Sequence, residues 1–258
     1  MATPEFSEFS YGYALTDSLL RTHFPRLRRA PVFPSLIAEG SSGGGYDLKI
    51  PAHPIPLFLQ FKIPQVLVRE STLKPKSYST PYYRMALRTK KPDQHALLLD
   101  LETREPLVFY ATPLFHSVGE LDRYFVRHTV HANSVFISPS LIGTLDNKPH
   151  HVAYKPRESI YWLRSEPKPL EGFVIGGNFE NAVLKIRSRS PRREARDVLR
   201  STWDWLLERR VAKQRSTQEA DIYQFPEDDV RDQARRVAYM AQVHFGITLA
   251  LLDSDVID

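Results

Sequence analysis

The segment EGSSGGGYDLKIPAHPIPLFLQFK, residues 39–62, decides how the first half of this chain is interpreted. Three glycines, Gly43 to Gly45, precede a Tyr-Asp pair, and a proline-bounded turn separates the two strand-like runs YDLKI and PLFLQFK. Because side chains alternate between the two faces of a strand, Gln60 and Lys62 share one face at the end of the second run. This parity turns both polar groups away from Leu57, Leu59 and Phe61.

The two runs have the lengths and the connection of an antiparallel hairpin. If residues 51–56 form the connection, Asp47 lies across from the segment between Gln60 and Lys62. A slip of one residue would move Asp47 to the opposite face, so this register is an assumption. In this register a carboxylate, an amide and an ammonium group meet on one face.

Such a set of groups suits a hard divalent cation. The carboxylate of Asp47, the amide oxygen of Gln60 and the carbonyl oxygen of Phe61 are the oxygen ligands that Mg²⁺ or Mn²⁺ takes, together with waters and phosphate oxygens. A bound metal lowers the pKa of its water and stabilises the charge that develops on a phosphate. Lys62 would orient that water or stabilise the transition state.

The combination GGGYDLKI…PLFLQFK resembles the active-site hairpin of the PD-(D/E)xK nuclease superfamily, and within it the Mrr-like restriction-endonuclease variants. In those variants Gln replaces the acid before x-Lys, as in Gln60-Phe61-Lys62, and here twelve residues (48–59) separate Asp47 from Gln60. The resemblance covers roughly residues 8–140. It implies an α/β (α+β) fold, with a restriction-endonuclease-like mixed sheet flanked by helices. It also implies a Mg²⁺-dependent endonuclease acting on DNA, with a role in bacterial anti-phage or restriction-type defence.

Two departures from the family pattern bear on the site. The family often carries a glutamate on its first helix, whereas here Glu8 lies just before the expected helix and Glu39 lies before the glycines. Glu39 is preferred as the fourth member of the site because its loop leads directly to Asp47. Gln60 is neutral, so the alternatives are an inactive relative that binds or senses nucleic acid, or an interaction subunit of a larger complex.

Hydrophobic patterns predict the remaining elements. Helices are expected over residues 11–24, in SVGELDRYFVRHT, and over 82–101 with a division at Pro92 and Asp93; strands are expected in PLVFYAT, SVFISPS and HHVAY. After a loop in SEPKPLEG, helices are expected in EARDVLRSTWDWLLERRVAKQ, with Pro191 in its first turn, and over 227–251. The domains are thus a nuclease core over 1–165 and a mainly helical region over 166–258, which packs on the core or binds a partner.

Basic residues cluster where they would meet an anionic partner. Arg84 and Arg88 would be one helical turn apart, with Lys91 following, so this expected helix is predicted to contact the phosphates of DNA, or of RNA as the alternative. The C-terminal helices permit a homodimer or the docking of a partner subunit.

Composition narrows the classes of protein further. The chain has 258 residues, a net charge of +5 and no cysteine, which excludes disulfides, zinc–thiolate sites and a cysteine nucleophile and fits the cytoplasm. It contains no apolar run of the roughly 18 residues that a bilayer span needs, so no membrane association is expected.

Overall fold

The computed structural model describes residues 4–23, 54–67, 81–87, 94–155, 161–163, 168–170, 174–211, 225–226 and 229–253. Asp47, Glu39 and the three glycines lie outside these residues, so only the second strand of the predicted hairpin is described. Contacts group the chain into two compact units, residues 1–30 with 60–185 and residues 31–59 with 186–258. The expected division into domains at residue 165 stays a prediction.

The first unit contains five of the helices in the described part of the chain. They are α1 (Glu8–His23), α2 (Gln94–Glu102), α3 (Val118–Val126), α4 (Pro139–Ile142) and α5 (Phe179–Arg187), which ends at the boundary of the unit, with the short 3-10 helices η2 (His131–Asn133) and η3 (Gly176–Asn178). Its strands are β2 (Gln65–Leu67), β3 (Tyr82–Leu87), β4 (Leu107–Pro113), β5 (Ser134–Ile137), β6 (His150–Tyr154), β7 (Tyr161–Leu163), β8 (Lys168–Leu170) and β9 (Val174–Ile175).

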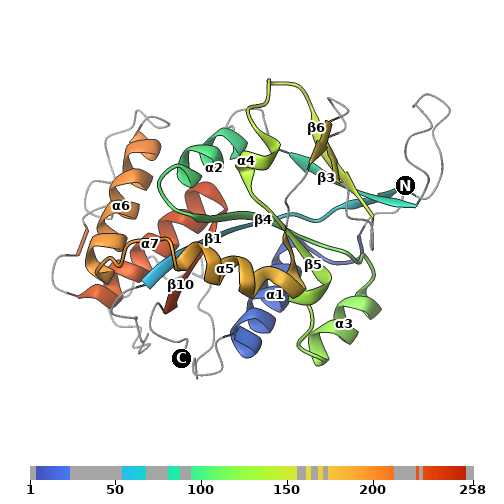
Figure 1. Ribbon diagram of the computed structural model, residues 1–258, viewed down its shortest axis with the longest axis horizontal. Coiled ribbons are helices and arrows are strands. Elements are labelled where there is room, and N and C mark those ends of the chain that lie inside the picture. Colours follow the sequence, from blue (N-terminus) through green and yellow to red (C-terminus); the bar gives the residue numbers. More distant parts are fainter. Residues whose placement is uncertain are drawn as a thin grey trace. The chain divides into compact units, whose positions relative to one another are not determined.

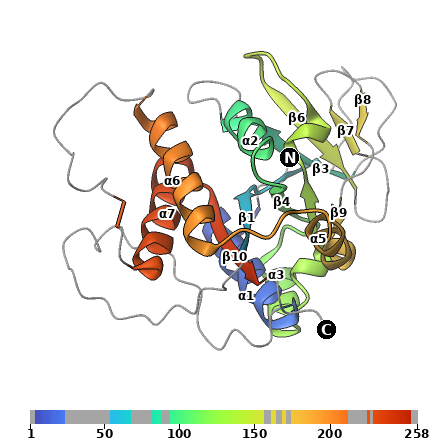
Figure 2. The same ribbon diagram turned by 60° about the vertical axis from the view of Figure 1, so that its left-hand side comes forward.

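Strands β2, β3, β6, β7 and β8 lie side by side in that order and pair antiparallel. The last four of them are labelled in Figure 2. Aromatic residues hold the middle of this sheet together, because the ring of Tyr154 stacks on Tyr83 at 5.6 Å and on Tyr161 at 5.3 Å between centroids. The hydroxyl of Tyr154 also donates to the carbonyl of Pro113, at 3.1 Å. That bond ties the sheet to the end of β4.

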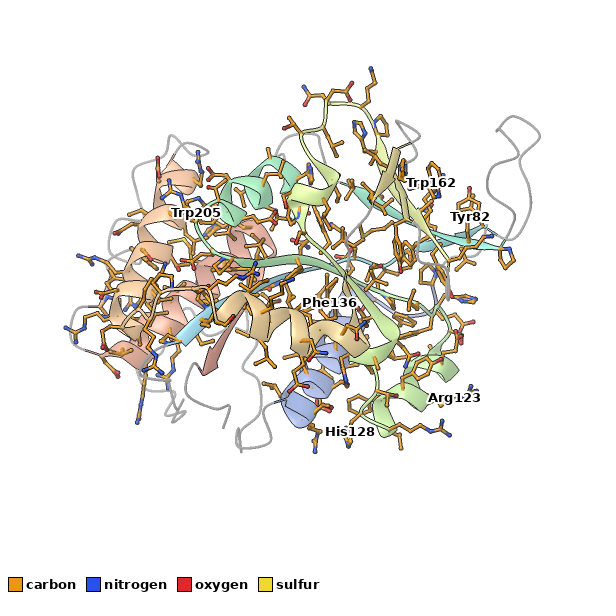
Figure 3. All side chains as sticks on the ribbon, in the orientation of Figure 1. Tyr82, Arg123, His128, Phe136, Trp162 and Trp205 are labelled. Atoms are coloured by element: carbon orange, nitrogen blue, oxygen red, sulfur yellow. The ribbon has the colours of Figure 1, made fainter. Side chains whose placement is uncertain are left out.

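Strand β4 pairs with β5, and β5 pairs with β9, again antiparallel. All seven residues of β4 are buried, as expected for a strand covered on both faces. Phe136 of β5, labelled in Figure 3, stacks on Phe179 at the start of α5 with ring centroids 4.1 Å apart. Helix α1 is tied to β5 by Tyr11, whose hydroxyl donates to Ser134 Oγ at 2.9 Å.

The second unit contains helices α6 (Ala195–Val211) and α7 (Val230–Phe245), which lie side by side in Figures 1 and 2. Trp205 of α6, labelled in Figure 3, contacts Phe245 of α7 with ring centroids 6.1 Å apart. Strand β1 (Pro54–Phe61) begins in this unit, where Pro54 to Leu59 pair antiparallel with β10 (Thr248–Asp253). Its last two residues belong to the first unit.

The described residues confirm a mixed α/β protein and most of the predicted elements. Three predicted helices are confirmed: the first helix, the helix after Pro92-Asp93 and the helix in SVGELDRYFVRHT. Four predicted strands are confirmed, in PLFLQFK, PLVFYAT, SVFISPS and HHVAY. No helix in the described segments is both long enough and apolar enough to cross a membrane.

Five details of the prediction are wrong. The expected connection over residues 51–56 is contradicted, because Pro54 to Pro56 already belong to β1, and Leu57 to Leu59 pair with β10 instead of forming a hairpin with YDLKI; among the described strands, the neighbours of β1 in its sheet are β10 and β4. Residues 82–87 form strand β3 instead of a helix, and β8 lies within the segment predicted as a loop. Pro191 precedes α6 by four residues instead of lying in its first turn. The last predicted helix ends at Phe245, because Gly246 takes a left-handed conformation at φ 67° and the chain continues as β10.

Candidate functional site

The candidate site lies where strand β1 ends in the first unit. Gln60 and Phe61 are its last two residues, and the backbone N–H of Lys62 donates to the carbonyl of Ala111 in β4, at 2.9 Å. This bond fixes the backbone at the point where the polar side chains emerge. Gln60 and Lys62 are only 4% and 8% exposed, so both polar groups are buried.

One side chain of α2 joins these two groups. Lys62 Nζ donates to Gln94 Oε1 at 3.0 Å, and Gln94 Nε2 donates to Gln60 Oε1. Gln60 Nε2 in turn donates to the carbonyl oxygen of Phe61, at 3.1 Å. We call this chain of hydrogen bonds, from Lys62 through Gln94 and Gln60 to the Phe61 carbonyl, the amide relay. It satisfies polar groups that would otherwise destabilise the fold by about 1–3 kcal/mol each.

The elements around the relay hold it in place. His95, next to Gln94 on α2, is buried with its Nε2 2.7 Å from the carbonyl of Gly143 and its Nδ1 3.0 Å from the hydroxyl of Tyr110. These two contacts fix the first turn of α2 against β4 and the segment after α4. They therefore set the position from which Gln94 reaches the end of β1.

Helix α1 approaches the other side of Phe61. The Tyr11 ring meets the Phe61 ring edge to face, with centroids 6.0 Å apart. A methyl group built on Gly12 would lie 2.5 Å from two carbons of the Phe61 ring, so the absence of a side chain at this position permits the approach. This packing holds the backbone that carries the Phe61 carbonyl.

Gln60 and the Phe61 carbonyl are hydrogen-bonded to each other, because the Nε2 of Gln60 donates to the carbonyl oxygen at 3.1 Å. The Oε1 of Gln60, the atom that a hard cation such as Mg²⁺ takes as a ligand, accepts from Gln94, so a cation beside the Phe61 carbonyl would require the Gln60 amide to reverse. Within the described segments, no group of three or more His, Cys, Asp or Glu side chains is placed to hold a metal ion. The carboxylate that the site needs would come from Asp47, which lies outside them.

The structure brings together some of the predicted site residues. Gln60 and Lys62 share one face, as alternation predicts, since both contact Gln94. Glu8 begins α1 and is exposed. Asp47, Glu39, Arg88 and Lys91 lie outside the described residues, and their roles stay predictions.

Arg84 lies in a different setting from the one predicted. It lies on strand β3, where it is opposite Gln65 of β2 and donates to the Gln65 side chain through Nη2. The helix predicted to carry Arg84 is therefore wrong at this position, and Arg88 lies outside the described residues. A role for Arg84 in binding phosphate stays a prediction.

Gln94 is the residue of this site that the sequence did not identify. It is 34 residues from Gln60 in the chain, and its helix is recognisable from the apolar pattern of QHALLLDLE alone. A polar amide at the first position of a helix is common, so that position gives no signal of a site. Only the packing of α2 against the end of β1 identifies it.

Comparisons with protein-family models, with curated proteins and with solved structures find no match to this chain. The resemblance to PD-(D/E)xK nucleases therefore stays a prediction that depends on the motif itself.

Proposed function

We propose that this protein is a metal-dependent nuclease that hydrolyses phosphodiester bonds in DNA, with a restriction-endonuclease-like core. The observation that carries the proposal is the end of β1, where an amide and a carbonyl oxygen lie 3.1 Å apart and an ammonium group is joined to the amide through one side chain. Two polar side chains buried at the end of an apolar strand destabilise a fold unless they are paired, and a functional site is a common reason to keep them.

Each group has a role in this proposal. Gln60 and the Phe61 carbonyl, with the carboxylate of Asp47, would hold Mg²⁺ or Mn²⁺, and Glu39 would complete the site. When bound, the metal supplies an activated water and neutralises charge on the phosphate. Lys62 presents three donors and one positive charge, so it orients the attacking water or stabilises the phosphoryl oxygens as the bond to the leaving oxygen breaks.

The charge of the protein supports a nucleic-acid substrate. The chain has a net charge of +5, and the second unit exposes Arg189, Arg192, Arg196 and Arg200 before and along α6. Contacts between arginines and phosphates supply affinity for nucleic acid but do not read its sequence. A role in anti-phage defence depends on the family resemblance alone.

Cleavage assays with matched lysine variants test the proposal. Plasmid, linear duplex, single-stranded DNA and RNA are incubated with Mg²⁺, Mn²⁺ or EDTA and with wild-type protein, Asp47→Ala, Lys62→Ala or Lys148→Ala. Lys148 is the control, because its side chain is 80% exposed in a loop and pairs with Asp146. We expect metal-dependent cleavage of DNA that falls by at least about 100-fold in the first two variants and stays unchanged in the third.

Two results would contradict the proposal. Cleavage that persists in Asp47→Ala and Lys62→Ala would exclude this site as its source. Salt-dependent binding of DNA that is indifferent to EDTA, with no cleavage under any metal, would support an inactive nucleic-acid-binding module instead.

A further inference from the structure

We propose that one face of the sheet formed by β2, β3, β6, β7 and β8 binds single-stranded nucleic acid, with a phosphate on Arg84 and a base on Trp162. One residue from each strand forms a row across this face, in the order Gln65, Arg84, Ala153, Trp162 and Pro169. We call the row the outer face. The inference rests on the proposed function and deepens it, because it names the strand state of the substrate.

The alternation of side chains separates the outer face from the buried face of the same sheet. Tyr154 and Tyr161, which follow Ala153 and precede Trp162 in the chain, stack on each other with ring centroids 5.3 Å apart. Their neighbours in the row therefore lie on the other side of the sheet. Tyr161 is buried, whereas Trp162, labelled in Figure 3, and Arg84 are partly exposed.

The charge of Arg84 lacks a counter-charge among the described residues. Its Nη2 donates to the neutral amide of Gln65, and its Nε is buried without a hydrogen-bond partner. By contrast, the guanidinium of Arg21 donates to the carboxylate of Asp17.

The strands around Arg84 carry no negative charge either. The described residues of the five strands include no Asp or Glu, so the outer face presents a positive charge to an approaching ligand. A guanidinium binds phosphate oxygens through charge-assisted hydrogen bonds. A phosphate group thus supplies the counter-charge that Arg84 lacks.

The position of Trp162 favours a single strand over a duplex. Arg84 and Trp162 are two strands apart, so their backbones lie about 10 Å from each other, and Ala153 between them carries only a methyl group. In a single strand an unpaired base can stack on an aromatic ring, whereas the bases of a duplex are already stacked and paired. A basic side chain beside a partly exposed ring is the combination that holds single strands.

Tryptophan fluorescence of the wild-type protein provides the first test. The chain has three tryptophans, and Trp203 and Trp205 are only 3% and 2% exposed, so Trp162 is the one that a base can reach. The protein is titrated in EDTA, which prevents metal-dependent cleavage, with an oligothymidylate of about 16 nucleotides or with a duplex of equal length. We expect the single strand to quench the fluorescence to saturation, with an affinity that falls as salt rises, and the duplex to quench it little.

Variants of the outer face provide the second test, measured by fluorescence anisotropy of a labelled oligothymidylate in EDTA. Trp162→Leu should weaken binding by about 5- to 150-fold, as the loss of one stacked base predicts. Arg84→Met should also weaken binding and lower the slope of log affinity against log salt by about 0.7. Arg123→Met is the control, because Arg123 is exposed on α3 and the substitution changes the net charge equally, so its affinity should stay close to that of wild type.

The outcomes separate the outer face from the nuclease site. If Trp162→Leu and Arg84→Met bind the single strand as wild type does, the outer face is overturned and metal-dependent cleavage at the end of β1 still stands. Duplex binding that equals single-strand binding and leaves the fluorescence unchanged overturns it as well. Weaker binding by both variants supports the outer face even if no metal permits cleavage, a result that refutes the proposed function alone. If Trp162→Leu fails to fold, an absence of quenching in wild type is sufficient to overturn the proposal.

Discussion

Replacing Gln60 by glutamate would change the amide relay by a single atom type. The NH₂ group of Gln60 donates to the Phe61 carbonyl at 3.1 Å, and the side chain is 4% exposed. In Gln60→Glu, a carboxylate oxygen faces that carbonyl, so a buried hydrogen bond becomes a contact between two acceptors. The other carboxylate oxygen still accepts from Gln94, which limits the damage.

The magnitude follows from that lost bond. A buried polar group left without its partner destabilises a fold by about 1–3 kcal/mol, which lowers the melting temperature of a domain of this size by about 2 to 12 °C. A carboxylate is a stronger ligand for Mg²⁺ than an amide, so the same change should tighten metal binding. Saturation to 100 times the dissociation constant stabilises a fold by about 2.7 kcal/mol, enough to reverse the loss.

Thermal unfolding of Gln60→Glu in EDTA and in Mg²⁺ provides the assay. We expect the variant to be less stable than wild type in EDTA and to recover in Mg²⁺. Gln65→Glu is the control, because its carboxylate would face Arg84 at the exposed start of β2, and its stability should not respond to Mg²⁺. The reasoning is refuted if Gln60→Glu is as stable as wild type in EDTA, or if Mg²⁺ fails to stabilise it.

Two further predictions concern the elements that surround the site. Gly12→Ala places a methyl carbon 2.5 Å from the Phe61 ring and should destabilise the protein by about 1–3 kcal/mol in urea unfolding. The control is Gly119→Ala, whose methyl group meets nothing within 4 Å and which should be neutral or stabilise the protein by up to about 1 kcal/mol. Equal changes in the free energy of unfolding for the two variants would contradict the close approach of Gly12 to Phe61. Burial alone raises the pKa of Glu120, but hydrogen bonds from the backbone N–H of His116 and from the backbone and side chain of Ser117 lower this pKa overall. The contribution of Glu120 to stability is therefore present above its ordinary pKa and is lost as the pH falls through the lowered one. Stability measured from about pH 6 to pH 2 should therefore fall less steeply in Glu120→Gln, and identical acid limbs would contradict this account.

Local sequence patterns predicted correctly those elements whose composition and apolar spacing agree with the conformation that they take in the structure. Strand β1 is an apolar run between prolines, and α2 has the composition of a helix, so both were recognisable. Strand β3 was not recognised, because residues 82–87 were included in the helix expected over 82–101. In the structure, pairing with β2 and β6 buries Tyr83, Met85 and Leu87 on alternate positions, and this tertiary pairing decides the conformation.

Strand β10, near the end of the chain, was also predicted as a helix, because its conformation depends on pairing with a distant strand. The segment TLALLD is rich in residues that favour helices, which led to the prediction of a continuous helix over 227–251. Gly246 ends α7, and antiparallel pairing with β1 places the segment in a strand. The partner strand is nearly 200 residues away in the sequence, so no local pattern could indicate it.

For the site, alternation along one strand was sufficient to place Gln60 and Lys62 on a common face. It could not show that this face is buried, or that α2 supplies Gln94 between them. Burial changes the chemistry, because an ammonium group and two amides shielded from water must pair with one another in a fixed order. The relay is thus a property of the packed chain that the motif alone does not contain.

Anomalous scattering from crystals soaked in Mn²⁺ would test the metal site most directly. Our account predicts a peak within coordination distance of Gln60 Oε1 and the Phe61 carbonyl, with Asp47 among its ligands and the Gln60 amide reversed. A peak elsewhere, or a Gln60 NH₂ group that still donates to the Phe61 carbonyl at saturating Mn²⁺, would contradict it.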